Sequence, residues 1–298
     1  MQPIFPFAGE ILSLLTAVFW ALAVTLFRKS GETVHPLALN IFKNVLALVL
    51  IIPTLWLLGH TLWQQAPART YLILFLSGAV GIGVGDTLFF NSLNRLGAGL
   101  TGIVVCMYSP FIIAFSFIWL HESLTGLQLI GVLLIICAIL FTTVHRTSRN
   151  DMPAQPFLAI VYGILASAAM AAGVVLMKPL LGLYPVIWVA GVRLIGGMAA
   201  LVLIMSIYPK RRKIMESLVR TKNWLYTLSG SLLGAYISMI LWIAGMKYTQ
   251  ASTASALNET STLFIFIFAW VLLKEPITAR RALGISMAFV GALLVSVF

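Results

Sequence analysis

The stretch Leu-His-Glu-Ser-Leu-Thr at residues 120–125 recurs as Leu-Lys-Glu-Pro-Ile-Thr at residues 273–278, and the glycines Gly131 and Gly284 follow the two copies. All of these positions are 153 residues apart. A second match links His35-Pro36 to Tyr184-Pro185 with an offset of 149 residues, and a change in loop length explains the difference between the offsets. The chain therefore contains two copies of one unit, which we place at residues 1–148 and 149–298.

The residues around these motifs are apolar almost throughout. Of the 298 residues, 61% are hydrophobic and 9% are charged, whereas a soluble domain has about 45–50% apolar and about 25% charged residues. Charge-free apolar stretches of roughly 20 residues, the length of a membrane-spanning helix, recur along the chain. This pattern excludes a soluble enzyme, a disordered chain and a disulfide-stapled secreted module. It predicts an all-α polytopic membrane protein.

Each copy contains five such stretches, so we expect ten transmembrane helices. Because five is odd, a second copy that follows the first through a short loop must enter the membrane in the opposite orientation. The expected architecture is thus two inverted five-helix repeats, as in many secondary transporters, whose substrate site lies between the repeats near the midplane. The predicted spans are 9–27, 36–58, 71–91, 98–119, 126–144, 157–178, 185–207, 224–245, 251–273 and 279–298.

The formal net charge is +11, with 19 Lys and Arg against 8 Asp and Glu. Most of the basic residues lie in the short connections between apolar stretches, which indicates membrane topology and not nucleic-acid binding. Fourteen of them lie in the connections that follow the odd-numbered spans, against three on the opposite side. The positive-inside rule then predicts that the first side is cytoplasmic and that both termini are extracytoplasmic. We expect a multi-pass protein of the plasma membrane, the inner membrane of a bacterium.

Four ionisable residues lie well inside predicted spans: Lys43, Asp86, Arg193 and Glu259. A charge at a helix centre costs at least about 2.5–3.5 kcal/mol unless it is paired or hydrated, so each of them is a functional candidate. Counting residues from the span ends puts Lys43 and Asp86 at one depth and Arg193 and Glu259 at another. We therefore predict two ion pairs, Lys43–Asp86 and Arg193–Glu259. A purely structural role is the alternative, above all for Lys43–Asp86.

Polar residues follow helical spacing in the ninth span. Ser252, Ser255, Glu259 and Thr262 recur every three or four positions, with Asn258 beside them. Such a stripe must face protein or a water-filled cavity, because lipid cannot satisfy it.

Other polar and aromatic residues extend this prediction to a cavity lined by spans 2, 4, 7 and 9. In span 4, Pro110 removes a backbone hydrogen bond and should kink the helix. We expect Glu259 and Arg193 to contact a zwitterionic substrate or its coupling proton. The remaining candidates are the polar residues Asn40 and Asn44 of span 2 and the aromatic residues Tyr108, Tyr236 and Trp242, with an interface belt as the alternative for Trp242.

The duplicated pattern Leu-x-Glu-x-Leu/Ile-Thr, followed by a glycine at the start of the last helix of each copy, resembles the EamA-type transporters of the drug/metabolite transporter superfamily. The resemblance covers both copies and includes the residues before the motif, 93–100 with 108–110 in the first copy and 245–255 in the second. It implies a ten-helix carrier of small metabolites, often an exporter, with a central cavity and no bound cofactor. One departure is that Leu263 stands in the second copy where Pro110 stands in the first.

The function expected from these observations is secondary active transport, the export of small metabolites such as amino acids. No ATP-binding motif is present in the sequence, and we expect no catalytic residues and no metal. The expected partners are a small-molecule substrate, a coupling proton and the lipid bilayer, without nucleic acid, and a monomer is sufficient. The alternatives are a flippase for a lipid-linked carrier, an integral-membrane enzyme and a passive channel.

Overall fold

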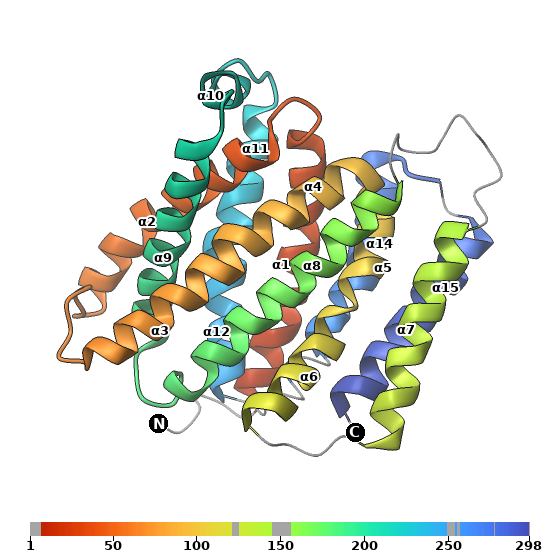
Figure 1. Cartoon of the computed structure of the whole chain (residues 1–298), viewed down its shortest axis with the longest axis horizontal. Helices are drawn as coiled ribbons and strands as arrows, with labels where there is room; N and C mark the ends of the chain where they lie inside the picture. Colours follow the sequence, from red (N-terminus) through yellow and green to blue (C-terminus); the bar gives the residue numbers. More distant parts are fainter. Residues whose placement is uncertain are drawn as a thin grey trace.

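A computed structural model describes residues 7–120, 125–144, 156–248, 254, 257–276 and 278–297 of the chain. All of the regular structure in these residues is helical (Figure 1). The first five predicted spans correspond to α1 (Ala8–Ser30), α2 (Pro36–Leu57), α3, η1 and α4 (Ala68–Gly78, Ala79–Gly85, Asp86–Leu96), α5 and α6 (Ala98–Val105, Tyr108–Leu120), and α7 (Gly126–Val144). The last five correspond to α8 (Pro156–Met177) with η2 (Lys178–Leu180), α9 (Val186–Ile207), α11, η3 and α12 (Trp224–Ser231, Leu232–Ser238, Met239–Tyr248), α14 (Ser261–Leu273) and α15 (Ala279–Val297).

Seven of the described helical segments are long and apolar enough to cross a membrane. They are 8–30, 36–57, 68–96, 98–119, 156–180, 186–207 and 224–248. Large apolar side chains such as Trp56, Leu133 and Trp270 are exposed on the outside of the bundle, as expected of a surface solvated by lipid. The chain is therefore a multi-pass helical membrane protein.

Two of the long helical segments, 68–96 and 224–248, each contain a π-helical turn. The first is η1 and the second is η3, and they are 153 residues apart, the offset of the sequence repeat. A π-helical turn widens the helix and changes the direction of the side chains that follow it, and such turns are frequent at functional sites. In the first half the turn ends immediately before Asp86, the first residue of α4.

The kink predicted at Pro110 is confirmed. The segment is divided into α5 and α6 by Cys106 and Met107, three to four residues before the proline. This break is closed by i→i−3 hydrogen bonds of 3.3 and 3.1 Å. Proline has no N–H to donate to the preceding turn, and its ring crowds the carbonyl four residues earlier, that of Cys106, which favours a break at this point. The break leaves Tyr108 and Ser109 in the first turn of α6.

The helices pack as two intertwined bodies and not as two separate halves of the sequence. The first two helices of the chain, α1 and α2, pack against α11, η3 and, for α1, also α12 and α14. In the same way α8 and α9 pack against α3 and η1, and α8 also against α4, α5 and α6. We call these groups body A (α1, α2, α11, η3, α12 and α14) and body B (α8, α9, α3, η1, α4, α5 and α6). The bodies meet along several helix pairs: α2 packs against α9 and α4, α12 against α9, and α14 against α5.

Glycine allows very close contact of α3 with α9 within body B. A Cβ atom added to Gly78 would lie 1.8 Å from the backbone carbonyl oxygen of Arg193, and one added to Gly196 would lie 2.1 Å from that of Phe75. Only glycine fits at such a crossing. The close contact fixes the position of Arg193 on α9 relative to η1.

The remaining helices lie at the edges of this arrangement. α7 and α15 pack against each other at one side of the bundle (Figure 1). The short helix α10 (Arg211–Val219) lies at one end of the bundle, and its buried residues Ile214 and Leu218 belong to the core cluster that it shares with α2. Helix α1 begins and α15 ends at the opposite end of the molecule (Figure 1).

Candidate functional site

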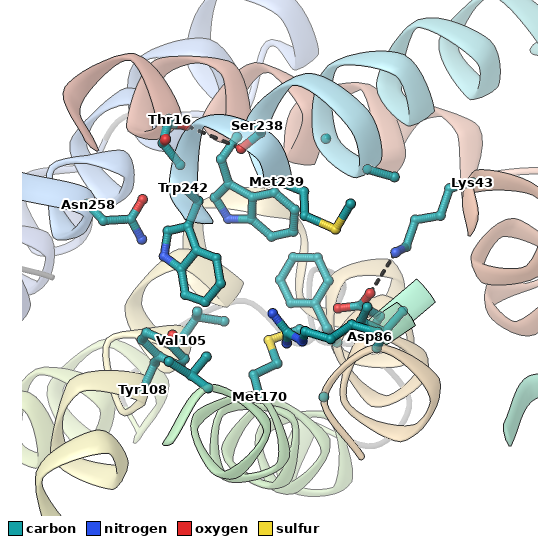
Figure 2. Close-up of a pocket in the computed structure, with 18 of the residues that line it drawn as sticks. Thr16, Lys43, Asp86, Val105, Tyr108, Met170, Ser238, Met239, Trp242 and Asn258 are labelled. Carbon is teal, nitrogen blue, oxygen red and sulfur yellow. Dashed lines mark hydrogen bonds and ion pairs between the residues drawn. The ribbon is translucent and has the colours of Figure 1, made fainter. Parts of the chain in front are cut away.

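A cavity of about 180 Å³ lies between body A and body B. Figure 2 shows the labelled side chains arranged around it, with Trp242 and Met239 on one side and Tyr108, Met170 and Asp86 on the other. The lining mixes apolar and aromatic groups with a few charged ones. It consists of Thr16, Trp20, Lys43, Asn44, Gly81, Ile82, Asp86, Phe89, Val105, Tyr108, Met170, Val174, Arg193, Gly234, Ala235, Ser238, Met239, Trp242 and Asn258.

The predicted ion pair between Lys43 and Asp86 is confirmed. The Nζ of Lys43 lies 2.6 Å from Oδ2 of Asp86, and the two side chains are 6% and 13% exposed. Lys43 belongs to body A and Asp86 to body B, so the pair joins the two bodies at the wall of the cavity (Figure 2). The Oδ1 atom of Asp86 accepts none of the hydrogen bonds that the described residues make.

Asn40 and Asn44 support this pair from α2. The Nδ2 of Asn40 donates to the carbonyl of Ile82 at 3.0 Å and to the hydroxyl of Thr87 at 2.9 Å. It thereby satisfies a carbonyl in the π-helical turn, where the backbone pattern is interrupted. The amide of Asn44 donates to Asn40 Oδ1 at 2.8 Å, and its own oxygen accepts from Lys43 at 3.4 Å. Asn44 lines the cavity, whereas Asn40 is completely buried behind it.

The predicted ion pair between Arg193 and Glu259 is wrong. Within the described part of the chain no carboxylate lies within 4.0 Å of Arg193. Its Nη1 donates to the sulfur of Met177 at 2.8 Å, and its guanidinium carbon lies 5.9 Å from the centre of the Trp242 ring. Arg193 therefore faces the cavity from body B, while Glu259 faces α6.

The guanidinium of Arg193 has unused donors. The side chain is 5% exposed, and its Nε is buried without a hydrogen-bond partner. A thioether is a weak acceptor, so neither nitrogen has the strong acceptor that a buried guanidinium requires. Lys43 and Asp86 neutralise each other, and the cavity consequently carries one net positive charge.

Glu259 lies in a second, smaller chamber of about 40 Å³ beside the cavity. Its carboxylate accepts a hydrogen bond from the hydroxyl of Ser109, the residue before Pro110. Thr262 lines the same chamber, and its hydroxyl lies 3.4 Å from the sulfur of Cys106. The polar stripe predicted for this helix thus faces protein at Glu259 and Thr262, while Ser255 lies outside the described residues.

The predicted aromatic residues have different environments. Tyr108 and Trp242 line the cavity. Tyr236 is not among its lining residues, and its hydroxyl lies 2.6 Å from that of Thr54 on α2. Tyr236 lies on the π-helical turn η3, and it is Gly234, Ala235 and Ser238 of this turn that face the cavity. The Tyr236 side chain therefore points away from the cavity.

Several lining residues were absent from the sequence-based prediction, namely Thr16, Trp20, Phe89, Met170, Val174 and Met239. They belong to α1, α4, α8 and α12, whereas the sequence predicts cavity-lining residues mainly in the spans that contain polar side chains. Apolar residues that line a cavity and apolar residues that face lipid look the same in a sequence. Thr16 and Ser238 could have been found from their polarity, and they are joined by a hydrogen bond of 3.5 Å to the Thr16 carbonyl (Figure 2).

The fold and the cavity together define the class of protein: a polytopic helical membrane protein with a solute-sized cavity between two helical bodies, lined by apolar and aromatic groups and a few charged ones. The model of the EamA-like transporter family matches residues 7–144 and again residues 157–297. The chain belongs to this family, which is part of the drug/metabolite transporter superfamily.

Curated relatives agree with this assignment. An uncharacterized transporter of Archaeoglobus fulgidus is 23% identical over 284 residues, which cover 95% of this chain and 96% of the relative. Protein PecM of Dickeya dadantii is 23% identical over 232 residues, which cover 74% of this chain and 72% of PecM. Protein LicB of Haemophilus influenzae is 22% identical, with 90% of each chain covered. A crystal structure with 15% sequence identity superposes with a TM-score of 0.68 over 96% of this chain and 95% of the other, which shows a shared fold.

Proposed function

We propose that the protein is a secondary active transporter that moves small zwitterionic metabolites, best represented by amino acids, through the cavity between bodies A and B. The observation that carries this proposal is the guanidinium of Arg193, which faces the cavity without a carboxylate partner and adjoins the Lys43–Asp86 pair. We infer export as the direction from the family resemblance.

Ten membrane-spanning helices in two inverted repeats are the architecture that this function requires. We count α7, α14 and α15 as the three further spans beside the seven long ones. The two family matches, the π-helical turns 153 residues apart and the mirrored packing of α1 and α8 support halves at residues 1–148 and 149–298. Five helices per half make the second half inverted, so that one fold can open to either side.

Each body combines the first two helices of one half with later helices of the other half, and we propose that the bodies are the moving parts. Body A and body B each contain helices of both halves, and the cavity lies between them. Rocking of one body against the other would open the cavity to one side and then to the other. The Lys43–Asp86 pair joins the bodies, so its geometry depends on which side is open.

The chemistry of the cavity selects the solute. Arg193 offers unused donors that match a carboxylate. The free Oδ1 of Asp86 can accept from an ammonium group, and the walls of Trp20, Phe89 and Trp242 suit an apolar side chain. A neutral amino acid with an apolar side chain satisfies all three parts of the site.

We place the protein in the plasma membrane with α10 on the cytoplasmic side. The basic residues of 210–213, Arg220 and Lys222 are exposed around α10, and they suit anionic headgroups. The beginning of α1 and the end of α15 lie at the other end of the molecule, which corresponds to extracytoplasmic termini. This orientation follows from the positive-inside rule, which places the side with more basic residues in the cytoplasm.

Counterflow in proteoliposomes tests the proposal. Vesicles loaded with an equimolar mixture of the neutral amino acids, nucleosides and amines are placed in isotope-labelled mixture, and uptake is read by mass spectrometry. Accumulation of a few related amino acids, absent from protein-free vesicles and strongly reduced in Arg193→Gln vesicles, is the expected result. Accumulation of no solute by folded protein would contradict the proposal and favour the flipping of a lipid-linked substrate.

A further inference from the structure

The chamber around Glu259 is separate from the main cavity but shares walls with it. Trp20, Phe89, Val105, Tyr108 and Asn258 line both spaces. Glu259, Ser261 and Thr262 line only the chamber, and Lys43, Asp86 and Arg193 line only the cavity. The volume of about 40 Å³ is close to the share of one water molecule, about 30 Å³. A solute the size of an amino acid cannot enter it.

Glu259 is a buried carboxyl group without a cation. The residue is 6% exposed, and no Lys, Arg or His nitrogen of the described chain lies within 4.0 Å of it. Its carboxylate accepts a hydrogen bond from the Ser109 hydroxyl. An uncompensated carboxylate in this position is costly, and uptake of a proton removes the cost.

An acceptor for that proton lies in the same chamber. The Oδ1 atom of Asn258 is buried and has no hydrogen-bond partner, and Asn258 lines the chamber next to Glu259. When Glu259 is a carboxylic acid, its O–H becomes a donor. Protonation thus adds a donor to a chamber whose lining includes a residue with an unsatisfied buried acceptor.

The hydrogen bond of Glu259 connects the two bodies. Glu259 lies in the segment that leads into α14 of body A, and Ser109 lies in the first turn of α6 of body B. Relative movement of the bodies must change or break this contact. The protonation of Glu259 is therefore linked to the same motion that opens the cavity.

We propose that Glu259 is the coupling-proton site of the transporter, in a chamber distinct from the substrate cavity. This inference rests on the function proposed above. In each cycle the Glu259 carboxylate takes up one proton from the aqueous phase on one side, forming a single O–H bond. It releases the same proton to the other side after the bodies have moved.

The titratable groups that face Glu259 are few. Tyr108 of α6 lines the chamber, and Cys106 contacts Thr262; both side chains are ordinarily neutral at physiological pH. α1 contributes Trp20 and Val24, α4 contributes Phe89, and α5 contributes Gly102 and Val105. α15, which also packs against α14, contributes no residue to the chamber. A pH response of transport that disappears when Glu259 is replaced is then assigned to Glu259 and not to these neighbours.

The test separates solute exchange from proton drive in proteoliposomes with the equimolar mixture of neutral amino acids as the probe. For one proton per solute, a gradient of one pH unit supports a concentration ratio of about tenfold. In the wild-type protein a pH gradient of one polarity should drive about tenfold accumulation. In Glu259→Gln counterflow should stay within about threefold of wild type, and the accumulation driven by the pH gradient should disappear.

Controls keep the outcome specific. Glu32→Gln, an exposed carboxylate in the connection after α1, should accumulate solute as the wild type does. Glu259→Asp keeps a titratable carboxyl group and should retain the accumulation driven by the pH gradient. If Glu259→Gln does not fold, Glu259→Asp is tested in its place. Full accumulation by folded Glu259→Gln would overturn the proton site. So would wild-type protein that performs counterflow but responds only to a sodium gradient or to no gradient, and that outcome leaves the transport function standing.

Discussion

The carboxylate of Glu275 accepts a hydrogen bond from the backbone N–H of Ala98 at 3.0 Å, across 177 positions of sequence. Its second oxygen accepts from the N–H of Gly99 at 3.3 Å. Ala98 is the first residue of α5, and Gly97 before it has a φ of 84°, which makes a sharp entry into the helix. The glutamate of the repeated motif in body A therefore caps a helix of body B.

Glu275→Ala should destabilise the protein by about 0.5–2 kcal/mol, the usual cost of a lost helix cap. The reason is that the free N–H groups at the start of α5 lose a partner that also interacts favourably with the helix dipole. Thermal unfolding in detergent, followed by size-exclusion chromatography, measures the effect. Glu216→Ala is the matched control, because Glu216 pairs with Arg220 on the surface helix α10. Equal midpoints for the two variants would refute the capping role.

Breaking the Lys43–Asp86 pair should cost about 3–5 kcal/mol, because either single substitution leaves a buried charge without a partner. Lys43→Met and Asp86→Leu are therefore expected to unfold well below the wild type in the same assay, and the double variant should recover most of the loss. Transport by the double variant should be reduced, since Asp86 is also an acceptor in the cavity.

The exposed pair of Lys29 and Glu32, with side chains 40% and 44% exposed, is the control for this comparison. Lys29→Met should change the stability by less than about 1 kcal/mol. A double variant no more stable than the worse single variant would show that the pair does not act as a unit.

Gly78→Ala should destabilise the crossing of α3 and α9 by about 1–3 kcal/mol, the range for overpacking a well-packed site. The added methyl would overlap the backbone of Arg193, so the helices must separate and Arg193 must move. Counterflow should fall along with the unfolding temperature. Gly182→Ala adds the same methyl where nothing lies within 4 Å, and it should behave as the wild type; a similar loss in both variants would exclude this explanation.

His35 should make the stability depend on pH. Burial lowers the pKa of His35 below its ordinary value of 6.5, and its Nδ1 accepts from the N–H of Leu37 at the start of α2. Above pH 6.5 the imidazole is neutral in both states and the contribution is complete. As the pH falls below 6.5 the unfolded chain binds the proton first, and stability is lost down to the folded pKa.

The wild type should accordingly lose more stability than His35→Asn when the pH is lowered from 7.5 to 5.5. Asparagine keeps an oxygen that can cap α2 but does not titrate. Parallel changes in the two proteins would assign the pH effect to other groups.

The positions of the helices followed from the sequence to within a few residues, since apolar length and charged connections define them. The Lys43–Asp86 pair was also predictable, because each residue is the only ionisable group in its helix centre. The π-helical turns were not, although the glycines of 78–85 mark the first of them. No residue type signals the extra residue in a π-helical turn.

The failed pair of Arg193 and Glu259 shows what depth alone leaves open. Residues Ile187 to Leu194 of α9 are all buried, so the helix has no periodic apolar face from which a direction could be predicted. Two residues at one depth can then face different elements, as Arg193 faces Met177 and Glu259 faces Ser109.

The most direct test of the account is whether Arg193 recognises the carboxylate of the solute. Counterflow should be measured for leucine, for 3-methylbutylamine, which lacks the carboxylate, and for 4-methylpentanoate, which lacks the ammonium group, in wild type, Arg193→Gln and Arg193→Lys. The wild type should prefer leucine to the amine by at least about tenfold, because the amine lacks one charged hydrogen-bonded contact. Arg193→Gln should abolish this preference, and Arg193→Lys should restore part of it. Transport of the amine by the wild type as fast as leucine, or an unchanged preference in Arg193→Gln, would contradict this role of Arg193.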